Sequence, residues 1–185
     1  MDTVSRKRLL PFWAVVILLF LLYGLVSVGL TKVFGLPWRA PIPLAIRLWI
    51  GIPLLAFGVG MYVWSNRSLS LKRALGKELF KPAAESTLVT TGAYAYSRNA
   101  IYFAVTLLLL GLFFIWRSTP VAMFTLFGFA HFMFVAKWEE RELTKRFGKE
   151  YLDYKQRVPF FIPGIRRRPG KIGESRRAAS NPEPL

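Results

Sequence analysis

The sequence contains no cysteine and only one histidine. Without cysteine the chain can form no disulfide, no thiolate metal site and no cysteine nucleophile. One histidine cannot supply the ligands of a histidine-based metal site, so no metal site is predicted. The glycine fingerprint G-x-G-x-x-G, which follows a strand in dinucleotide-binding domains, is also missing, and no segment has the pattern of a strand.

Apolar residues make up 54% of the 185 residues and aromatic residues 16%, and they are gathered in long blocks. This content is too high and too uneven for a soluble domain of this size. The formal net charge is +16, but the basic residues flank the apolar blocks instead of lining one folded face. The pattern therefore indicates a membrane protein and no nucleic-acid partner.

Four apolar blocks are predicted to be membrane helices, at Leu9–Leu30, Pro41–Trp64, Ala100–Trp116 and Thr119–Ala136. The first two are each long enough to cross about 30 Å of hydrocarbon. The first is too long for a cleaved signal peptide and lacks a small-residue cleavage site. The last two are joined so closely, across Arg117 and Ser118, that they must form an antiparallel hairpin.

The charge distribution predicts that both termini face the cytoplasm. With four crossing helices, the cytoplasmic segments are 1–8, 65–99 and 137–185. They then hold all ten acidic residues and every basic residue except Lys32, Arg39, Arg47 and Arg117. Such an excess on one side follows the positive-inside rule. The predicted fold is thus an all-α integral membrane protein of about four transmembrane helices with a C-terminal cytoplasmic helical extension.

The predicted extension carries an apolar stripe on a charged helix, formed by Leu143, Phe147, Tyr151 and Tyr154, with an interruption at Gly148. The stripe indicates packing back onto the helix ends, and the alternative is a helix lying on lipid. We divide the chain into an N-terminal helix pair (1–64), a core (65–163) and a disordered basic tail (164–185) attracted to anionic lipid.

Polar residues are predicted to meet at one end of the hairpin. Positions equally distant from the turn between Ser118 and Thr119 lie level, because both helices rise 1.5 Å per residue. The segment TTGAYAYSRNAIY, residues 90–102, therefore brings Arg98 and Asn99 level with Glu139 and Glu140. Two interpretations remain open: an ion pair between Arg98 and Glu139 that pins the hairpin, or a cavity that holds a polar ligand.

The single histidine, His131, lies in an apolar span. It is either a functional intramembrane group or a hydrogen-bond partner of a neighbouring helix.

Two segments carry a family resemblance. STLVTTGAYAYSRNAIY, followed after the hairpin by EERELTKRFGKEYLDYKQRVPFFIP, resembles the integral-membrane methyltransferases: the isoprenylcysteine carboxyl methyltransferases and the related phospholipid methyltransferases. Their shared pattern is LVTxGxYxxxRHPxY, a helix pair, EE, and FGxEYxxYxxxVPxxIP. The match spans residues 86–163.

The resemblance implies an S-adenosylmethionine-dependent enzyme that methylates a lipid-soluble, membrane-embedded acceptor. By motif position, the implied catalytic residues are Arg98 and Glu140. The implied cofactor-binding residues are Ser86, Thr87, Leu88, Val89, Tyr94, Asn99, Ala100, Ile101, Tyr102 and Glu139.

The sequence departs from the family pattern at several positions. Asn99 and Ala100 replace the His-Pro of RHP, and Ala93 replaces a common proline. Carboxyl-methylating members carry an arginine one turn before the glutamate pair, where this chain has Val135. A prenylcysteine carboxylate is therefore in doubt as acceptor, and an amine headgroup or another nucleophile remains open.

Two alternatives to the methyltransferase are considered. One is a non-catalytic membrane protein that retains the fold. The other is a reductase similar to the sterol reductases, which use NADPH, although so short a chain leaves little room for that cofactor. Oligomeric state is left open.

Overall fold

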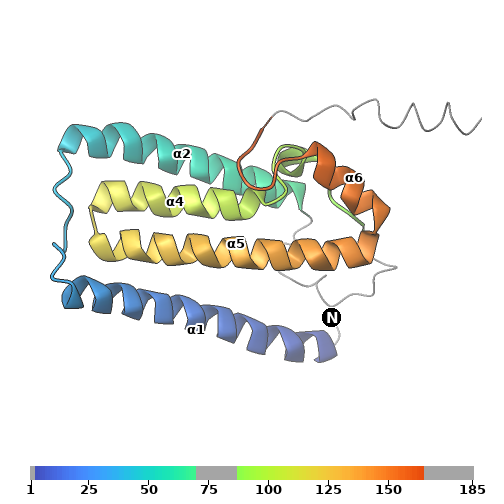
Figure 1. Ribbon diagram of the computed structural model, residues 1–185, viewed down its shortest axis with the longest axis horizontal. Coiled ribbons are helices and arrows are strands. Elements are labelled where there is room, and N and C mark those ends of the chain that lie inside the picture. The colour runs from blue at the N-terminus through green and yellow to red at the C-terminus, as the bar shows by residue number, and fades with distance from the viewer. Residues whose placement is uncertain (1–2, 70–86, 165–185) are drawn as a thin grey trace, which may run out of the picture.

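The computed structural model describes residues 3–69 and 87–164, and all regular elements in these ranges are helical. Figure 1 shows four long helices lying side by side: α1 (Thr3–Val33), α2 (Leu44–Ser68), α4 (Ala100–Trp116) and α5 (Thr119–Phe147). The 3-10 turn η2 (Gly92–Ala95) and the short helix α6 (Lys149–Arg157) lie together at one end. The prediction of an all-helical fold is confirmed.

Two of the helices, α2 and α5, are long and apolar enough to cross a membrane. The other two apolar segments, Ile17–Val33 of α1 and all of α4, are shorter. At 17 residues, α4 falls short of the roughly 20 that usually span the hydrocarbon core. Four crossing helices, and which side each terminus faces, therefore stay predictions.

Two helix boundaries differ from those expected. Helix α2 begins at Leu44 and not at Pro41, because Pro43 has an extended backbone (φ −56°, ψ 148°). Helix α5 does not stop at Ala136 but continues to Phe147, since the charged residues that follow are good helix formers. It ends at Gly148, whose φ of +51° favours glycine. The interruption predicted at Gly148 is thus confirmed.

Helices α2 and α4 approach each other closely because glycines face the neighbouring helix. A Cβ on Gly58 would lie 3.1 Å from the backbone nitrogen of Leu108. One on Gly111 would lie 2.7 Å from Leu55 Cγ and 3.0 Å from its backbone nitrogen. Small residues permit such contact between helices where lipid removes the hydrophobic drive to associate. Helix α4 is consequently held firmly against α2.

Helix α1 packs against α5 through an aromatic cluster around His131. The Tyr23 hydroxyl lies 3.1 Å from His131 Nδ1. The Phe20 ring is 6.4 Å from the imidazole and 5.8 Å from the Phe124 ring. Of the two interpretations of His131, the structure favours a hydrogen bond to a neighbouring helix.

At the end of the bundle opposite α6, the loop between α1 and α2 is bonded to the hairpin turn. Ala40 N donates to Arg117 O (2.7 Å), and Thr119 N donates to Trp38 O (3.1 Å). Arg47 donates through Nη2 to Ile115 O at 2.6 Å. These bonds satisfy backbone groups where α4 ends and α5 begins. We call this region, formed by residues 37–47 and 115–119, the closed end.

Candidate active site

The opposite end of the bundle holds the sequence-predicted site, and the approach to it begins at Gly92. This glycine has φ +60°, and a Cβ there would lie 2.0 Å from Ser68 Oγ at the end of α2. The same hydroxyl accepts a hydrogen bond from Ala93 N at 3.1 Å. The segment entering α4 is therefore fixed against α2 at a position where a side chain would not fit.

A second segment, residues 158–164, lies along the start of α4 and is hydrogen-bonded to it. Arg98 N donates to Pro159 O (3.0 Å), Ser97 Oγ to Phe161 O (2.6 Å) and Asn99 Nδ2 to Phe160 O (2.8 Å). Arg98 and Asn99 belong to the RHP-like motif and Ser97 directly precedes it, so the Asn99 amide supplies a bond to segment 158–164. These bonds hold segment 158–164 over the start of α4.

Arg98 and Glu140 form a buried ion pair at this end. Their side chains are only 8% and 11% exposed. Lys155 of α6 donates to the other carboxylate oxygen of Glu140 at 3.0 Å. One carboxylate thus bridges two cations, which compensates the cost of burying it. The hairpin register is confirmed, but the partner of Arg98 is Glu140 and not Glu139.

Glu139 has a different environment, although it is the next residue. Its Oε1 accepts a hydrogen bond of 2.9 Å from the Tyr102 hydroxyl, and its other oxygen accepts none from the described residues. The Tyr102 ring stacks on Phe132 at 5.2 Å and 14°. The tyrosine is held in position from one side by this ring, so the carboxylate is oriented and still has acceptor capacity.

Three tyrosines lie around Glu139 and Glu140: Tyr94 comes from η2, and Tyr151 and Tyr154 come from α6. The Tyr154 hydroxyl donates to Tyr94 O at 2.7 Å. Burial raises the pKa of Tyr94, and Tyr154 and Glu139 raise it further. Burial also raises the pKa of Tyr151 to about 12; Glu140 adds to the rise and Arg98 opposes it. These phenols therefore stay protonated near neutral pH and act as neutral hydrogen-bond donors.

The apolar stripe of the predicted C-terminal extension, residues 143–154, packs on the rest of the protein. Tyr151, Tyr154 and Val158 form a buried cluster, with Leu88, Leu143 and Phe147 against it. The stripe thus contacts the lead-in segment, residues 86–89 before η2, through Leu88 instead of lying free. That this region faces the cytoplasm stays a prediction.

The structure places the predicted site residues in different surroundings, and two of them, Arg98 and Glu140, form the ion pair described above. Ser86 lies outside the described residues. Thr87, Leu88 and Val89 lie in the lead-in segment, and Tyr94, Tyr102 and Glu139 are brought near one another. Ala100 is fully buried in a small cluster with Met61, Ala93 and Ala104, so the two alanines that replace prolines are packing residues here. Asn99 is bonded to the C-terminal segment, and the half-buried Ile101 follows it on α4.

Sequence reasoning missed Lys155 as a partner of Glu140, and it missed the carbonyls of residues 159–161 as acceptors. A signal existed for Lys155: it follows Tyr151 by four residues and so lies on the same side of the helix as the predicted stripe. For the carbonyls there was no signal, because every residue has one.

The chain has two apolar helices long enough to cross a membrane and an oriented polar cluster at one end of the bundle. These features are typical of helical membrane proteins. A family model described as phospholipid methyltransferase matches residues 46–150, more than half of the chain. The chain belongs to the phospholipid methyltransferase family, a family of membrane methyltransferases, as the sequence motifs predicted. Comparisons with curated proteins and with solved structures returned no match.

Proposed function

We propose that the protein transfers a methyl group from S-adenosylmethionine to a membrane-embedded lipid or prenylated acceptor, on a carboxyl or an amine. The observation that carries the proposal is Glu139, whose carboxylate is oriented by Tyr102 and whose second oxygen accepts no hydrogen bond from the described residues. Tyr94 lies close enough to interact with it electrostatically. These residue types suit a ligand with an ammonium group and a sulfonium, through ionic and cation–π attraction.

In this proposal the residues of the lead-in segment, Ser86–Val89, and of the start of α4, Asn99–Tyr102, bind the cofactor together with Tyr94 and Glu139. When bound, S-adenosylmethionine supplies an electrophilic methyl group that needs no acid to activate it. The work left to the protein is therefore positioning and exclusion of water. Segment 158–164 contributes to both positioning and exclusion of water, since it is hydrogen-bonded over the start of α4.

Arg98 and Glu140 are proposed to act where the methyl group is transferred. The Glu140 carboxylate holds Arg98 in place, and Lys155 holds Glu140. Val135 presents no charge one turn before Glu139, which favours a neutral nucleophile such as an amine over a carboxylate. The proposed core is residues 65–163; the family match extends further toward the N-terminus, into α2.

The proposal includes four membrane-crossing helices with both termini in the cytoplasm. The absence of native cysteine allows a direct test with single cysteines at two exposed positions, Arg39→Cys and Lys145→Cys. An impermeant maleimide should label the first in intact cells and the second only after permeabilisation. Labelling of both positions in intact cells would contradict this topology.

The function is tested by calorimetry of S-adenosylmethionine binding to the detergent-purified protein. We expect Glu139→Gln and Tyr102→Phe to weaken binding by about tenfold or more, as loss of a charge-assisted contact does. Glu142→Gln is the matched control, because Glu142 is exposed and pairs only with Lys145 in the described chain. A folded protein that binds no S-adenosylmethionine would refute the proposal. NADPH would then be titrated to separate a reductase from a non-catalytic protein.

A further inference from the structure

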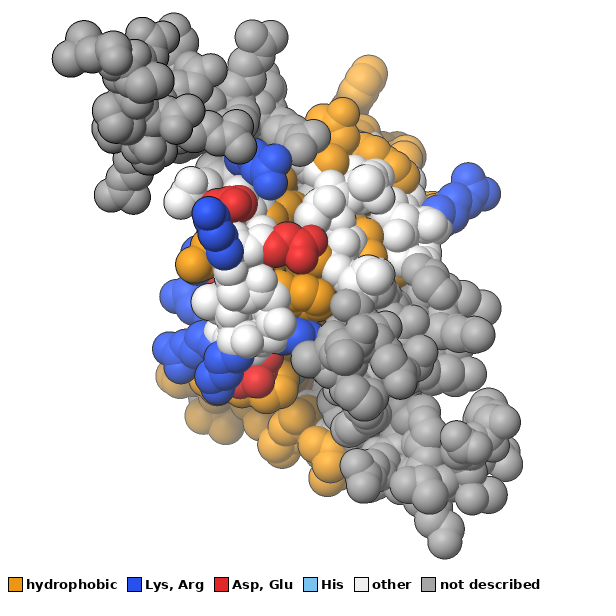
Figure 2. Space-filling view, turned by 90° about the vertical axis from the view of Figure 1, so that its right-hand side faces the viewer, with side chains coloured by type: hydrophobic (Ala, Val, Ile, Leu, Met, Phe, Trp, Pro, Cys, Tyr) orange, Lys and Arg blue, Asp and Glu red, His pale blue; other side chains and the backbone are white. Residues whose placement is uncertain are grey.

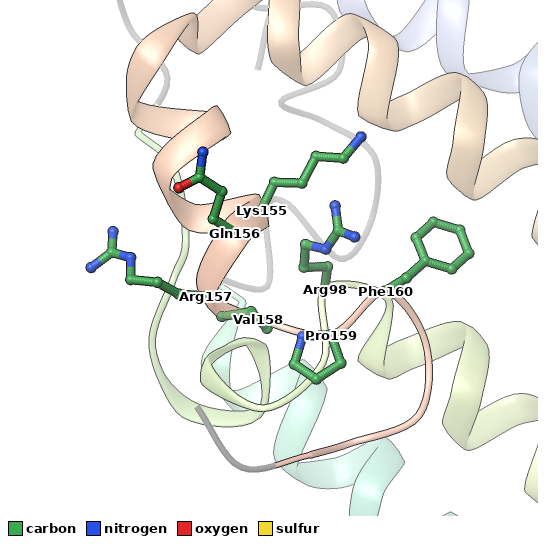
Figure 3. Close-up of a pocket in the computed structure, with 7 residues that line it drawn as sticks. All are labelled: Arg98, Lys155, Gln156, Arg157, Val158, Pro159 and Phe160. Atoms are coloured by element: carbon green, nitrogen blue, oxygen red, sulfur yellow. The ribbon is translucent and has the colours of Figure 1, made fainter. Parts of the chain in front are cut away.

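A separate pocket lies beside the candidate active site, between α6 and the segment that follows it. Its volume is about 250 Å³, and its lining comprises Arg98, Lys155, Gln156, Arg157, Val158, Pro159 and Phe160. Figure 3 shows Lys155 reaching over Arg98, with the Phe160 ring next to them, whereas the Arg157 side chain extends away from these groups. Residues 155–160 lie beyond the part of the chain that the family model matches.

The charges around this pocket do not balance. Three of its lining residues are cationic, and no acidic side chain is among them. The carboxylate that reaches Arg98 and Lys155 is Glu140, and it neutralises one of the two. The Arg157 side chain makes one bond in the described chain, from Nε to the Asp153 carbonyl at 3.0 Å, and no salt bridge. The group therefore keeps an excess of about two positive charges.

Arg98 also keeps an unused donor. Its side chain is nine-tenths buried, and its Nε has no hydrogen-bond partner among residues 3–69 and 87–164. The guanidinium lies over the Phe160 ring, 5.5 Å from its centre. A buried donor without a partner is uncommon in proteins. An oxyanion in the pocket offers an acceptor that the protein itself does not supply.

Exposed aromatic side chains lie at both ends of the bundle, including the end that holds the pocket. Trp64, Tyr96 and Trp138 are all exposed, and the rings of Trp64 and Tyr96 lie 5.5 Å apart. Such side chains favour the depth of the lipid headgroups. Figure 2, which looks onto this end, shows Lys and Arg side chains next to hydrophobic ones. An anion at this depth is most readily the phosphate of a lipid.

We propose that the pocket formed by Arg98, Lys155, Gln156 and Arg157 binds a phosphate group, carried by a membrane phospholipid or free in solution. Guanidinium and ammonium groups bind phosphate oxygens through short charge-assisted hydrogen bonds. The pocket lining contains none of the residues proposed to bind S-adenosylmethionine, and it shares Arg98 with the residues proposed to act in methyl transfer. The proposal does not depend on methyl transfer.

The test measures binding of two probes to the full chain in an uncharged detergent: inorganic phosphate, and a short-chain phosphatidic acid. We expect Lys155→Gln and Arg157→Gln each to weaken binding about tenfold. Lys149→Gln is the matched control: it makes the same charge change on the same helix, outside the pocket lining. It should change the affinity less than twofold.

The outcomes separate the sources of the phosphate. Binding of both probes with the same loss in the two variants supports a site open to either source, whereas binding of the lipid alone identifies the headgroup. Binding of inorganic phosphate alone identifies a soluble ligand. The proposal is overturned if neither probe binds or if the control loses as much affinity. It is also overturned if S-adenosylhomocysteine displaces the probe, since the pocket would then belong to the cofactor site.

Lys155→Gln also removes a partner of Glu140, so its stability must be compared with that of the reference protein. Arg157→Gln is free of this complication, because the side chain only donates to a backbone carbonyl.

Discussion

The two ends of α4 use polar groups in opposite ways. At the closed end, the bonds join backbone to backbone, as in Ala40 N to Arg117 O, or a side chain to a helix-terminal carbonyl, as in Arg47 to Ile115 O. The other end also has bonds to backbone carbonyls, as from Asn99 Nδ2 to Phe160 O. In addition, side chains there bond to side chains: Arg98 and Lys155 to Glu140, and Tyr102 to Glu139.

The two ends differ in how completely their polar groups are hydrogen-bonded within the described residues. The closed end satisfies carbonyls that a helix terminus leaves without partners. Within the part of the chain that the structure describes, the site end retains a carboxylate oxygen on Glu139 and a donor on Arg98 that make no hydrogen bond. Polar groups that the protein orients and does not fully satisfy are available to ligands. The two ends therefore differ in role: one fastens the bundle, and the other is the end that we propose binds ligands.

The largest expected effect comes from removing one charge at each end. Arg98→Met leaves Glu140 buried with Lys155 as its remaining cation, and should lower the free energy of unfolding by about 3–5 kcal/mol. Arg47→Met removes a bond to a carbonyl and should cost about 1–2 kcal/mol. Unfolding in detergent by a denaturing surfactant measures both.

The double variant Arg98→Met/Glu140→Leu should recover much of the loss, because it also removes the buried carboxylate that has lost one of its two cations. Equal losses in Arg98→Met and Arg47→Met would remove the distinction between the two ends.

A smaller effect is expected from glycines with positive φ, one near each end. Gly92→Ala places a methyl group 2.0 Å from Ser68 Oγ in addition to the strain of φ +60°, so we expect a loss of about 2–3 kcal/mol. Gly35→Ala has the same strain, with φ +59°, but meets nothing within 4 Å and should cost about 1 kcal/mol. The same unfolding assay compares them, and a reversed order would show that Ser68 does not hold η2.

The smallest effect is a dependence on alkaline pH at the site end. The pKa of Tyr151 is raised to about 12 in the folded protein, above the value of about 10 for an unfolded chain. The protonated phenol therefore contributes stability that is fully present below pH 10 and is lost as the pH rises through 12. Phenolate absorbance should show one group titrating near pH 12 that is missing in Tyr151→Phe. Its persistence in that variant would assign it to another tyrosine.

The sequence predicted much of the site because helical geometry is regular. A two-residue connection between two apolar blocks requires antiparallel neighbours, and equal rise then sets Arg98 beside the glutamate pair. It could not decide which glutamate pairs with Arg98. Adjacent residues on a helix point about 100° apart, so the partner depends on how α5 is rotated about its axis.

The contacts of segment 158–164 could not be predicted for a different reason. Its acceptors are backbone carbonyls, which carry no sequence signature, and they meet Ser97 and Asn99 from 61 to 64 residues away. The aromatic stripe indicated that Tyr151 and Tyr154 would be buried, but not that Leu88 would be among the residues packed against them.

The sequence by itself determined the helical class, the hairpin, the family and the end of the bundle where the polar residues gather. These follow from hydropathy, spacing and motif, which act along the chain. The tertiary structure decided which polar groups are paired and which are left for a ligand. That division depends on helix rotation and on a returning C-terminal segment, because hydrogen bonds form only between groups that packing brings within about 3 Å.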